Sequence, residues 1–160
     1  RNGSERSYTF HGRDIFAFVG ARLAAGVISF DEVGPALEPK VAMIVYARAR
    51  REGAVLIGMI PTLDIRYGNV WTNIDDELFA ELGPKIGDRF RVIIARGEKR
   101  VLAMEVAYAR TFADVPAGAP LLYLNSLLNV SLALNTGDFA RSHSVGKGAE
   151  WTIRLEKVTP

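Results

Sequence analysis

The chain has 160 residues, of which 49% are apolar and 24% are charged, an ordinary composition for a globular protein. A net charge of +2, with one tight basic cluster at Arg48, Arg50 and Arg51, argues against nucleic-acid binding. The absence of cysteine excludes disulfides and thiolate metal sites, and the spacing of His11 and His143 indicates no metal site. No apolar run reaches membrane-spanning length and no signal-peptide pattern is seen, so we expect a cytoplasmic protein that binds neither nucleic acid nor membrane.

Residues 1–40 have the pattern of a strand end, a helix and a linker. Residues 8–14 contain a short β-prone run followed by a glycine turn, and Asp14 is suited to cap a helix that runs to about Ala25. Val27–Lys40 is rich in proline and glycine, so we predict a domain boundary at its end. Because the first residue is arginine and a patterned segment follows almost at once, we expect the chain to be part of a longer protein.

Residues 41–160 carry short apolar runs that recur at strand-like intervals with turn residues between them. The predicted strands are Val41–Tyr46, Ala54–Pro61, Arg89–Ala95, Val101–Arg110, Leu121–Leu124, Val130–Leu134 and Trp151–Leu155. Arg48–Glu52 is polar and turn-like, and Asp75–Leu82 is the one segment with a helical pattern, with carboxylates at its start. The pattern predicts a mainly β fold, with an antiparallel barrel or sandwich over 41–160.

Asp64–Ile74 holds the densest group of special residues. Gly68 and Asn69 are typical of a turn with positive φ. In the strand that follows, the period of two places Asn69, Trp71 and Asn73 on one face. Two amides and an indole on one face suit the recognition of a flat ring with polar edges. A hairpin bend with one anchoring tryptophan explains the same residues equally well.

Three motifs occur in a fixed order along the chain: Thr9–Phe16, then Asp64–Ile74, then Tyr123–Ser126 continued by Ser131–Asn135. In this order they resemble the S-adenosylmethionine (SAM) hydrolase family, also called SAM hydroxide adenosyltransferases. The bacterial fluorinase and chlorinase are halide-using relatives of that family. The resemblance covers nearly the whole chain. It implies that residues 1–40 are the last strand and helix of an α/β domain, and that 41–160 are a β-barrel-like substrate-binding domain.

The resemblance implies displacement at the 5′ carbon of SAM by water or hydroxide, giving adenosine and methionine. It implies no metal or other cofactor, and a homotrimer with active sites between subunits. His11 matches the histidine that orients or activates the water, a task suited to imidazole. The acid and arginine that act with it belong upstream, so we expect this chain alone to be inactive. Because halogenases differ at His11 and Gly12, water is favoured over halide, and a SAM-dependent halogenase is the alternative.

The second motif implies most of the substrate contacts. Asp64 matches the acid that binds the methionine ammonium, and Asn69 matches the amide that hydrogen-bonds adenine through its paired donor and acceptor. Tyr67 and Trp71 match aromatic walls of the adenine site, and Phe112 matches a further ring over the base.

The third motif implies the remaining contacts and two departures. Ser126 matches a serine at the methionine end, with help from the backbone of Leu127. The family has a glycine near Leu128, and an arginine of the fluorinase that contacts adenine aligns with Leu134. From the residues alone, a non-catalytic barrel that binds nucleosides or forms oligomers is a further alternative.

Overall fold

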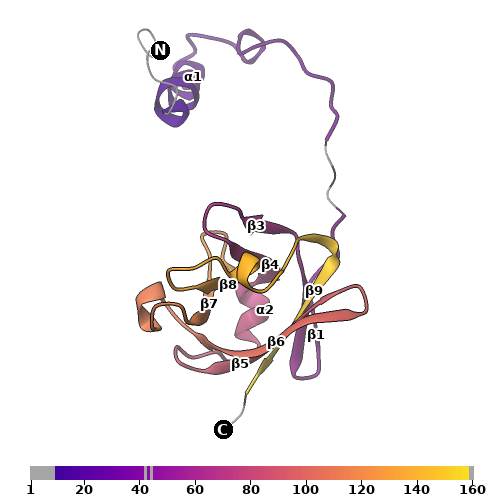
Figure 1. Ribbon diagram of the computed structural model, residues 1–160. Helices are drawn as coiled ribbons and strands as arrows, with labels where there is room; N and C mark the ends of the chain where they lie inside the picture. The colour runs from indigo at the N-terminus through magenta and orange to yellow at the C-terminus, as the bar shows by residue number, and fades with distance from the viewer. Residues whose placement is uncertain (1–9, 42, 44, 159–160) are drawn as a thin grey trace. The chain divides into compact units, whose positions relative to one another are not determined.

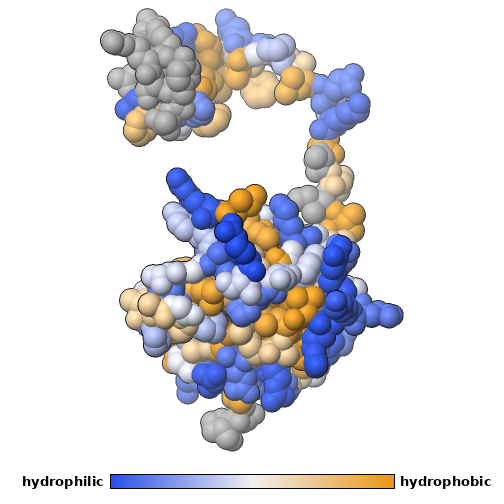
Figure 2. Space-filling view, in the orientation of Figure 1, coloured by the Kyte–Doolittle hydropathy of each residue, from blue (hydrophilic) through white to orange (hydrophobic). Residues whose placement is uncertain are grey.

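The computed structural model describes residues 10–41, 43 and 45–158. The chain divides into two units, Arg1–Ala42 and Met43–Pro160. In the first unit, a π-helical turn over Gly12–Phe16 leads into helix α1, Ala17–Ala24, and a 3-10 turn follows at Phe30–Glu32. The space-filling view shows apolar side chains on the outside of this unit (Figure 2).

The start of the first helix differs from the prediction. His11 occupies the N-terminal cap position with helical backbone angles, and its side chain caps nothing. Asp14 lies inside the first turn, where it is buried and accepts hydrogen bonds of 2.7 Å from Arg13 Nε and Nη2. Residues 8 and 9 of the predicted β-prone run lie outside the described residues, Phe10 is in no strand, and His11 stands at the cap of the helix.

The second unit is built on one nine-stranded sheet with the order β1-β2-β9-β5-β6-β7-β8-β4-β3 (Figure 1). The strands are β1 (Arg50–Glu52), β2 (Val55–Ile60), β3 (Thr62–Asp64), β4 (Asn69–Asp75), β5 (Arg89–Arg96), β6 (Lys99–Tyr108), β7 (Pro120–Leu124), β8 (Asn129–Leu134) and β9 (Gly148–Lys157). Neighbouring strands are antiparallel except β6 and β7, which are parallel. The predicted mainly β fold is confirmed.

The sheet curls until β2 and β4, which are not neighbours in it, lie against each other. The side chain of Asn73 joins them: its Oδ1 accepts from Met59 N at 2.7 Å, and its Nδ2 donates to Ala47 O at 2.6 Å. A Cβ atom on Gly58 would lie 2.7 Å from Asn73 Oδ1, so this approach requires glycine. The two ends of the sheet order, β1 and β3, do not pair with each other, so the predicted barrel is not closed.

The inside of the curved sheet is filled by apolar side chains, and helix α2, Asp76–Ala80, adds Phe79 to this core. Asp75 caps this helix by accepting from Leu78 N at 2.8 Å. Phe79 is 1% exposed and packs on Phe90 and Tyr108, with ring centroids 5.2 and 5.1 Å away. A second short helix, α3 (Phe139–Ser142), packs near β4 and β8.

Two expectations about the start of this unit are wrong. The described residues of Val41–Tyr46 form no strand, and Arg48–Glu52 is not a turn, because Arg50–Glu52 forms β1 and pairs with β2. All three side chains of β1 are exposed and charged, as is common in edge strands, so the strand carries no apolar signal. Along the described ranges, no helix is both long and apolar enough to span a membrane.

Candidate functional site

The turn between β3 and β4 places an acid beside an amide. Asp64 ends β3 and Asn69 begins β4, and the two are directly opposite each other in the antiparallel pair. The carbonyl oxygen of Asp64 accepts from Tyr67 N at 3.1 Å and from Gly68 N at 2.7 Å, which closes the turn. Gly68 has φ +70°, a conformation that L side chains rarely adopt. This tight turn therefore holds Asp64 and Asn69 side by side.

Three further side chains form a row across the sheet beside Asn69. Tyr123 of β7 is opposite Ser131 of β8, which is opposite Trp71 of β4. Since residues two apart in a strand face the same side, this row lies on the face that carries Asn69. Asn69 and Trp71 therefore lie on the same face of the sheet, as predicted.

A cavity of about 660 Å³ opens on this face, within the size range of small-molecule sites. It is lined by Asp64, Arg66, Tyr67, Asn69, Phe112, Tyr123, Leu134, Thr136, Gly137 and Asp138.

Four of the residues predicted to bind substrate meet in this cavity: Asp64, Tyr67, Asn69 and Phe112. Asn69 is 5% exposed, whereas Tyr67 is 60% and Phe112 is 37% exposed. The amide is therefore deep in the cavity and the aromatic rings are nearer its mouth. The Phe112 ring packs on the Tyr123 ring, with centroids 5.3 Å apart and planes at 56°, so two rings form one wall.

The other four predicted residues do not line the cavity. Trp71 is half-buried beside it, and its Nε1 is buried without a hydrogen-bond partner in the described part of the chain. Ser126 and Leu127 are exposed in the turn between β7 and β8. His11 is exposed and belongs to the first unit.

The environment of the cavity changes the pKa of Tyr123. Burial raises the pKa of the Tyr123 hydroxyl, and the negative charge of Asp64 raises it further. The nearby polar side chains of Trp71, Ser131 and Asn69 act in the opposite direction, but the net shift of the pKa is upward. Tyr123 is a neutral hydrogen-bonding group at neutral pH, as an ordinary tyrosine is, and the upward shift leaves this unchanged.

Sequence reasoning missed several lining residues that come from the turn after β8. Leu134 pairs with Gly137, and Thr136 between them has φ +59°. Nothing in the sequence pattern of this turn marks it as part of a site, because its approach to β4 depends on packing between distant segments. Tyr123 carried an available signal, because it lies in the third motif. Among the described residues, no group of three or more His, Asp or Glu side chains could hold a metal ion.

Comparison with known proteins identifies the family of the chain. Residues 58–152 match the family model of the SAM hydroxide adenosyltransferase C-terminal domain. The chain belongs to this family. The (R)-S-adenosyl-L-methionine hydrolase of Salinispora arenicola is 33% identical over 94% of the chain and 52% of its own length. The fluorinase of Actinoplanes sp. is 30% identical over 94% of the chain and 50% of its own length. The family resemblance inferred from the three motifs is confirmed.

A solved structure of a conserved Thermotoga maritima protein has the same fold, with a TM-score of 0.64 and 34% sequence identity. The match covers 93% of this chain and 53% of that one. The chain thus spans about half the length of the fluorinase and of the SAM hydrolase that it matches.

Proposed function

We propose that this chain supplies the adenine- and methionine-binding part of a SAM hydrolase. In the reaction, water or hydroxide attacks the 5′ carbon of SAM, the bond from that carbon to sulfur breaks, and the electron pair leaves with methionine. The observation that carries the proposal is the cavity in which Asp64, Asn69 and Phe112 meet, in a chain of this family.

The deep part of the cavity suits adenine. The Asn69 amide can donate to one edge atom of the base and accept from its neighbour. The rings of Phe112 and Tyr67 offer flat surfaces for the base, and stacking on an aromatic ring is worth about 1–3 kcal/mol per base. Two rings and a buried amide in one cavity favour a planar heterocycle over a flexible polar ligand.

Asp64 suits the ammonium group of the amino-acid end. One of its carboxylate oxygens accepts a long hydrogen bond of 3.3 Å from Arg66 N, and within the described residues Asp64 forms no ion pair. Its charge is therefore available for a ligand, and a charge-assisted hydrogen bond to an ammonium is about twice as strong as a neutral one. Asp64 and Asn69 would then hold the two ends of one substrate.

The sulfonium makes methionine a good neutral leaving group, so the remaining task is to orient water and substrate. We assign the water to His11, because histidine is the side chain used most often to transfer protons in general acid–base catalysis. On this proposal the enzyme is a homotrimer with sites between subunits, uses no cofactor, and requires an acid and an arginine beyond this chain. The chain alone would then bind ligand without turnover.

Isothermal titration calorimetry with adenosine and SAM tests the binding role. Asn69→Ala is expected to weaken adenosine binding at least tenfold. Glu98→Ala, at the exposed turn between β5 and β6, is the matched control and should leave the affinity unchanged. Wild-type chain that binds neither ligand would refute the proposal.

Product analysis tests the reaction in the full-length, trimeric protein. Incubation with SAM is expected to give adenosine and methionine, with an oxygen atom from labelled water in the adenosine. The relatives include fluorinases, so parallel reactions should contain fluoride or chloride. If a 5′-halogenated product formed in place of adenosine, the enzyme would be a halogenase and the proposed hydrolase activity would be refuted.

A further inference from the structure

The charges that line the cavity are unevenly paired. Asp138 is satisfied within the protein: its Oδ1 accepts from Arg141 N at 2.7 Å, and its Oδ2 lies 3.5 Å from Arg141 Nε. Arg66 is the one cation among the lining residues, and the described part of the chain gives it no ion pair. The cavity thus presents one available acid, Asp64, and one available cation, two residues apart.

A free α-amino acid group carries an ammonium and a carboxylate. A site that binds the ammonium with Asp64 gains little unless a second group binds the carboxylate, because an unpaired charge moved from water is costly. The guanidinium fork matches a carboxylate with two parallel hydrogen bonds. Asp64 can bind the ammonium of the ligand but not its carboxylate. The guanidinium of Arg66 is a suitable partner for that carboxylate.

The turn between β7 and β8, expected to hold this end of the substrate, offers less. Its leucines are exposed, Leu127 at 67% and Leu128 at 55%, and add no charge. Asn125 already accepts hydrogen bonds from the backbone of this turn. Its Oδ1 accepts from Leu127 N at 2.8 Å and from Asn129 N at 3.1 Å, and its carbonyl oxygen accepts from Leu128 N at 2.9 Å. These three N–H groups already have partners, so a carboxylate would have to displace them. The exposed Ser126 of the same turn can donate its hydroxyl, but it carries no charge.

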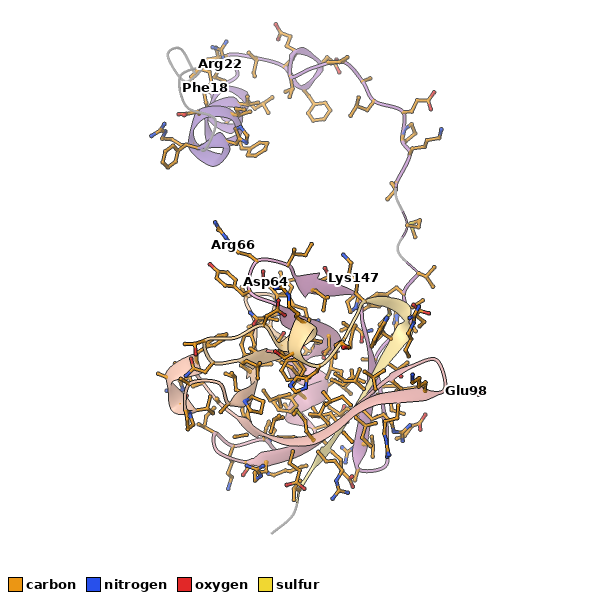
Figure 3. All side chains as sticks on the ribbon, viewed as in Figure 1. Phe18, Arg22, Asp64, Arg66, Glu98 and Lys147 are labelled. Carbon is orange, nitrogen blue, oxygen red and sulfur yellow. The ribbon has the colours of Figure 1, made fainter. Side chains whose placement is uncertain are left out.

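We propose that Arg66 binds the carboxylate of the ligand's α-amino acid group, as the partner of Asp64. This assignment rests on the proposed function and makes Arg66 a specificity-determining residue. The exposed Arg66 side chain extends outward from the β3–β4 turn (Figure 3). Binding of the carboxylate therefore requires the guanidinium to turn toward the cavity that this residue lines.

The proposal defines the ligand class as a sulfonium nucleoside with an intact α-amino acid group. Decarboxylated SAM has the same base, ribose, sulfonium and amine, but no carboxylate. Arg66 would face its positive charges without a partner. The wild-type protein is therefore expected to bind SAM at least tenfold more tightly than the decarboxylated compound.

The test compares three ligands with three proteins by calorimetry: SAM, decarboxylated SAM and adenosine against wild type, Arg66→Gln and Arg100→Gln. Arg66→Gln should weaken SAM binding at least tenfold. The affinity of this variant for adenosine should stay within twofold of the wild-type value. Its affinity for decarboxylated SAM should be unchanged or higher. Arg100→Gln, at an exposed arginine of the β5–β6 hairpin, should leave every affinity within twofold. Equal weakening of all three ligands, or unchanged SAM binding, would overturn the role of Arg66. Adenosine binding by wild type reports separately on the proposed function.

Discussion

A methyl group on Gly68 would overlap the carboxylate of Asp138. The contact joins the turn that ends in Asn69 to the residue that caps α3, and Ala140 N donates to Gly68 O at 2.9 Å across the same junction. The end of the cavity that carries Asn69 is thus held by packing between segments about 70 residues apart in sequence. Changes at this junction should affect stability and ligand binding together.

Gly68→Ala is predicted to lower the free energy of unfolding by more than the roughly 1–2 kcal/mol that a left-handed backbone alone costs. The added methyl also displaces Asp138. Gly97→Ala is the matched control, since Gly97 has φ +56° with no atom within 4 Å of an added Cβ. Urea unfolding measures both variants. Equal losses would show that the Asp138 contact contributes nothing.

The amides of Asn69 and Asn73 are predicted to have separate roles. Asn73→Ala leaves Met59 N and Ala47 O without partners at the junction of β2 and β4, so the free energy of unfolding should fall by about 2–3 kcal/mol. Asn69→Ala should change stability less and adenosine affinity more. Thermal unfolding measures the stability of the two variants, and calorimetry measures their affinity for adenosine. A larger stability loss for Asn69→Ala, or a larger affinity loss for Asn73→Ala, would contradict the prediction.

Leu128→Gly is predicted to stabilise the protein. Leu128 has φ +59° in an exposed turn, and a non-glycine residue in that conformation is strained by about 1 kcal/mol or more. Part of that gain is offset by the greater freedom of glycine in the unfolded chain. Leu127→Gly has no positive φ to relieve and should destabilise. A lower melting temperature for Leu128→Gly than for wild type would exclude the strain.

Asp88 is predicted to contribute to acid sensitivity. Its Oδ2 lies 2.7 Å from Lys157 Nζ and accepts from Lys85 N at 2.7 Å, and the hydrogen bond from Lys157 is the main reason that its pKa is lowered. A lowered pKa stabilises the fold above the unfolded value of about 3.9. That contribution is lost as pH falls through the folded pKa. The Asp88→Asn variant should therefore be less stable than wild type at neutral pH. Below about pH 4 its stability should depend less on pH than that of wild type. Parallel melting-temperature profiles from neutral to acid pH would contradict the prediction.

Much of the sheet could be predicted because core-facing residues alternate along it. Arg89–Ala95, for example, was predicted as a strand and β5 extends one residue further, to Arg96. β1 was missed because exposed charged residues show no alternation of apolar and polar side chains. Val41–Tyr46 was wrongly predicted because β-prone residues form a strand only when a neighbouring strand pairs with them.

The site was predictable where it depends on local geometry. The turn from Asp64 to Asn69 and the shared face of Asn69 and Trp71 follow from turn chemistry and strand period. Placing Trp71 beside the cavity, and Asp138 in it, requires knowing how β7, β8 and α3 pack on β4. That information lies in contacts between distant residues, which one sequence does not reveal.

The position of β9 has a consequence for how the chain folds. β9 lies between β2 and β5, so this last strand joins two parts of the sheet that come much earlier in the sequence. During synthesis β2 and β5 must wait for Gly148–Lys157 to leave the ribosome, with their inner edges unpaired. Such long-range pairing slows folding and exposes strand edges to aggregation. Loss of these ten residues would therefore divide the sheet instead of trimming its edge.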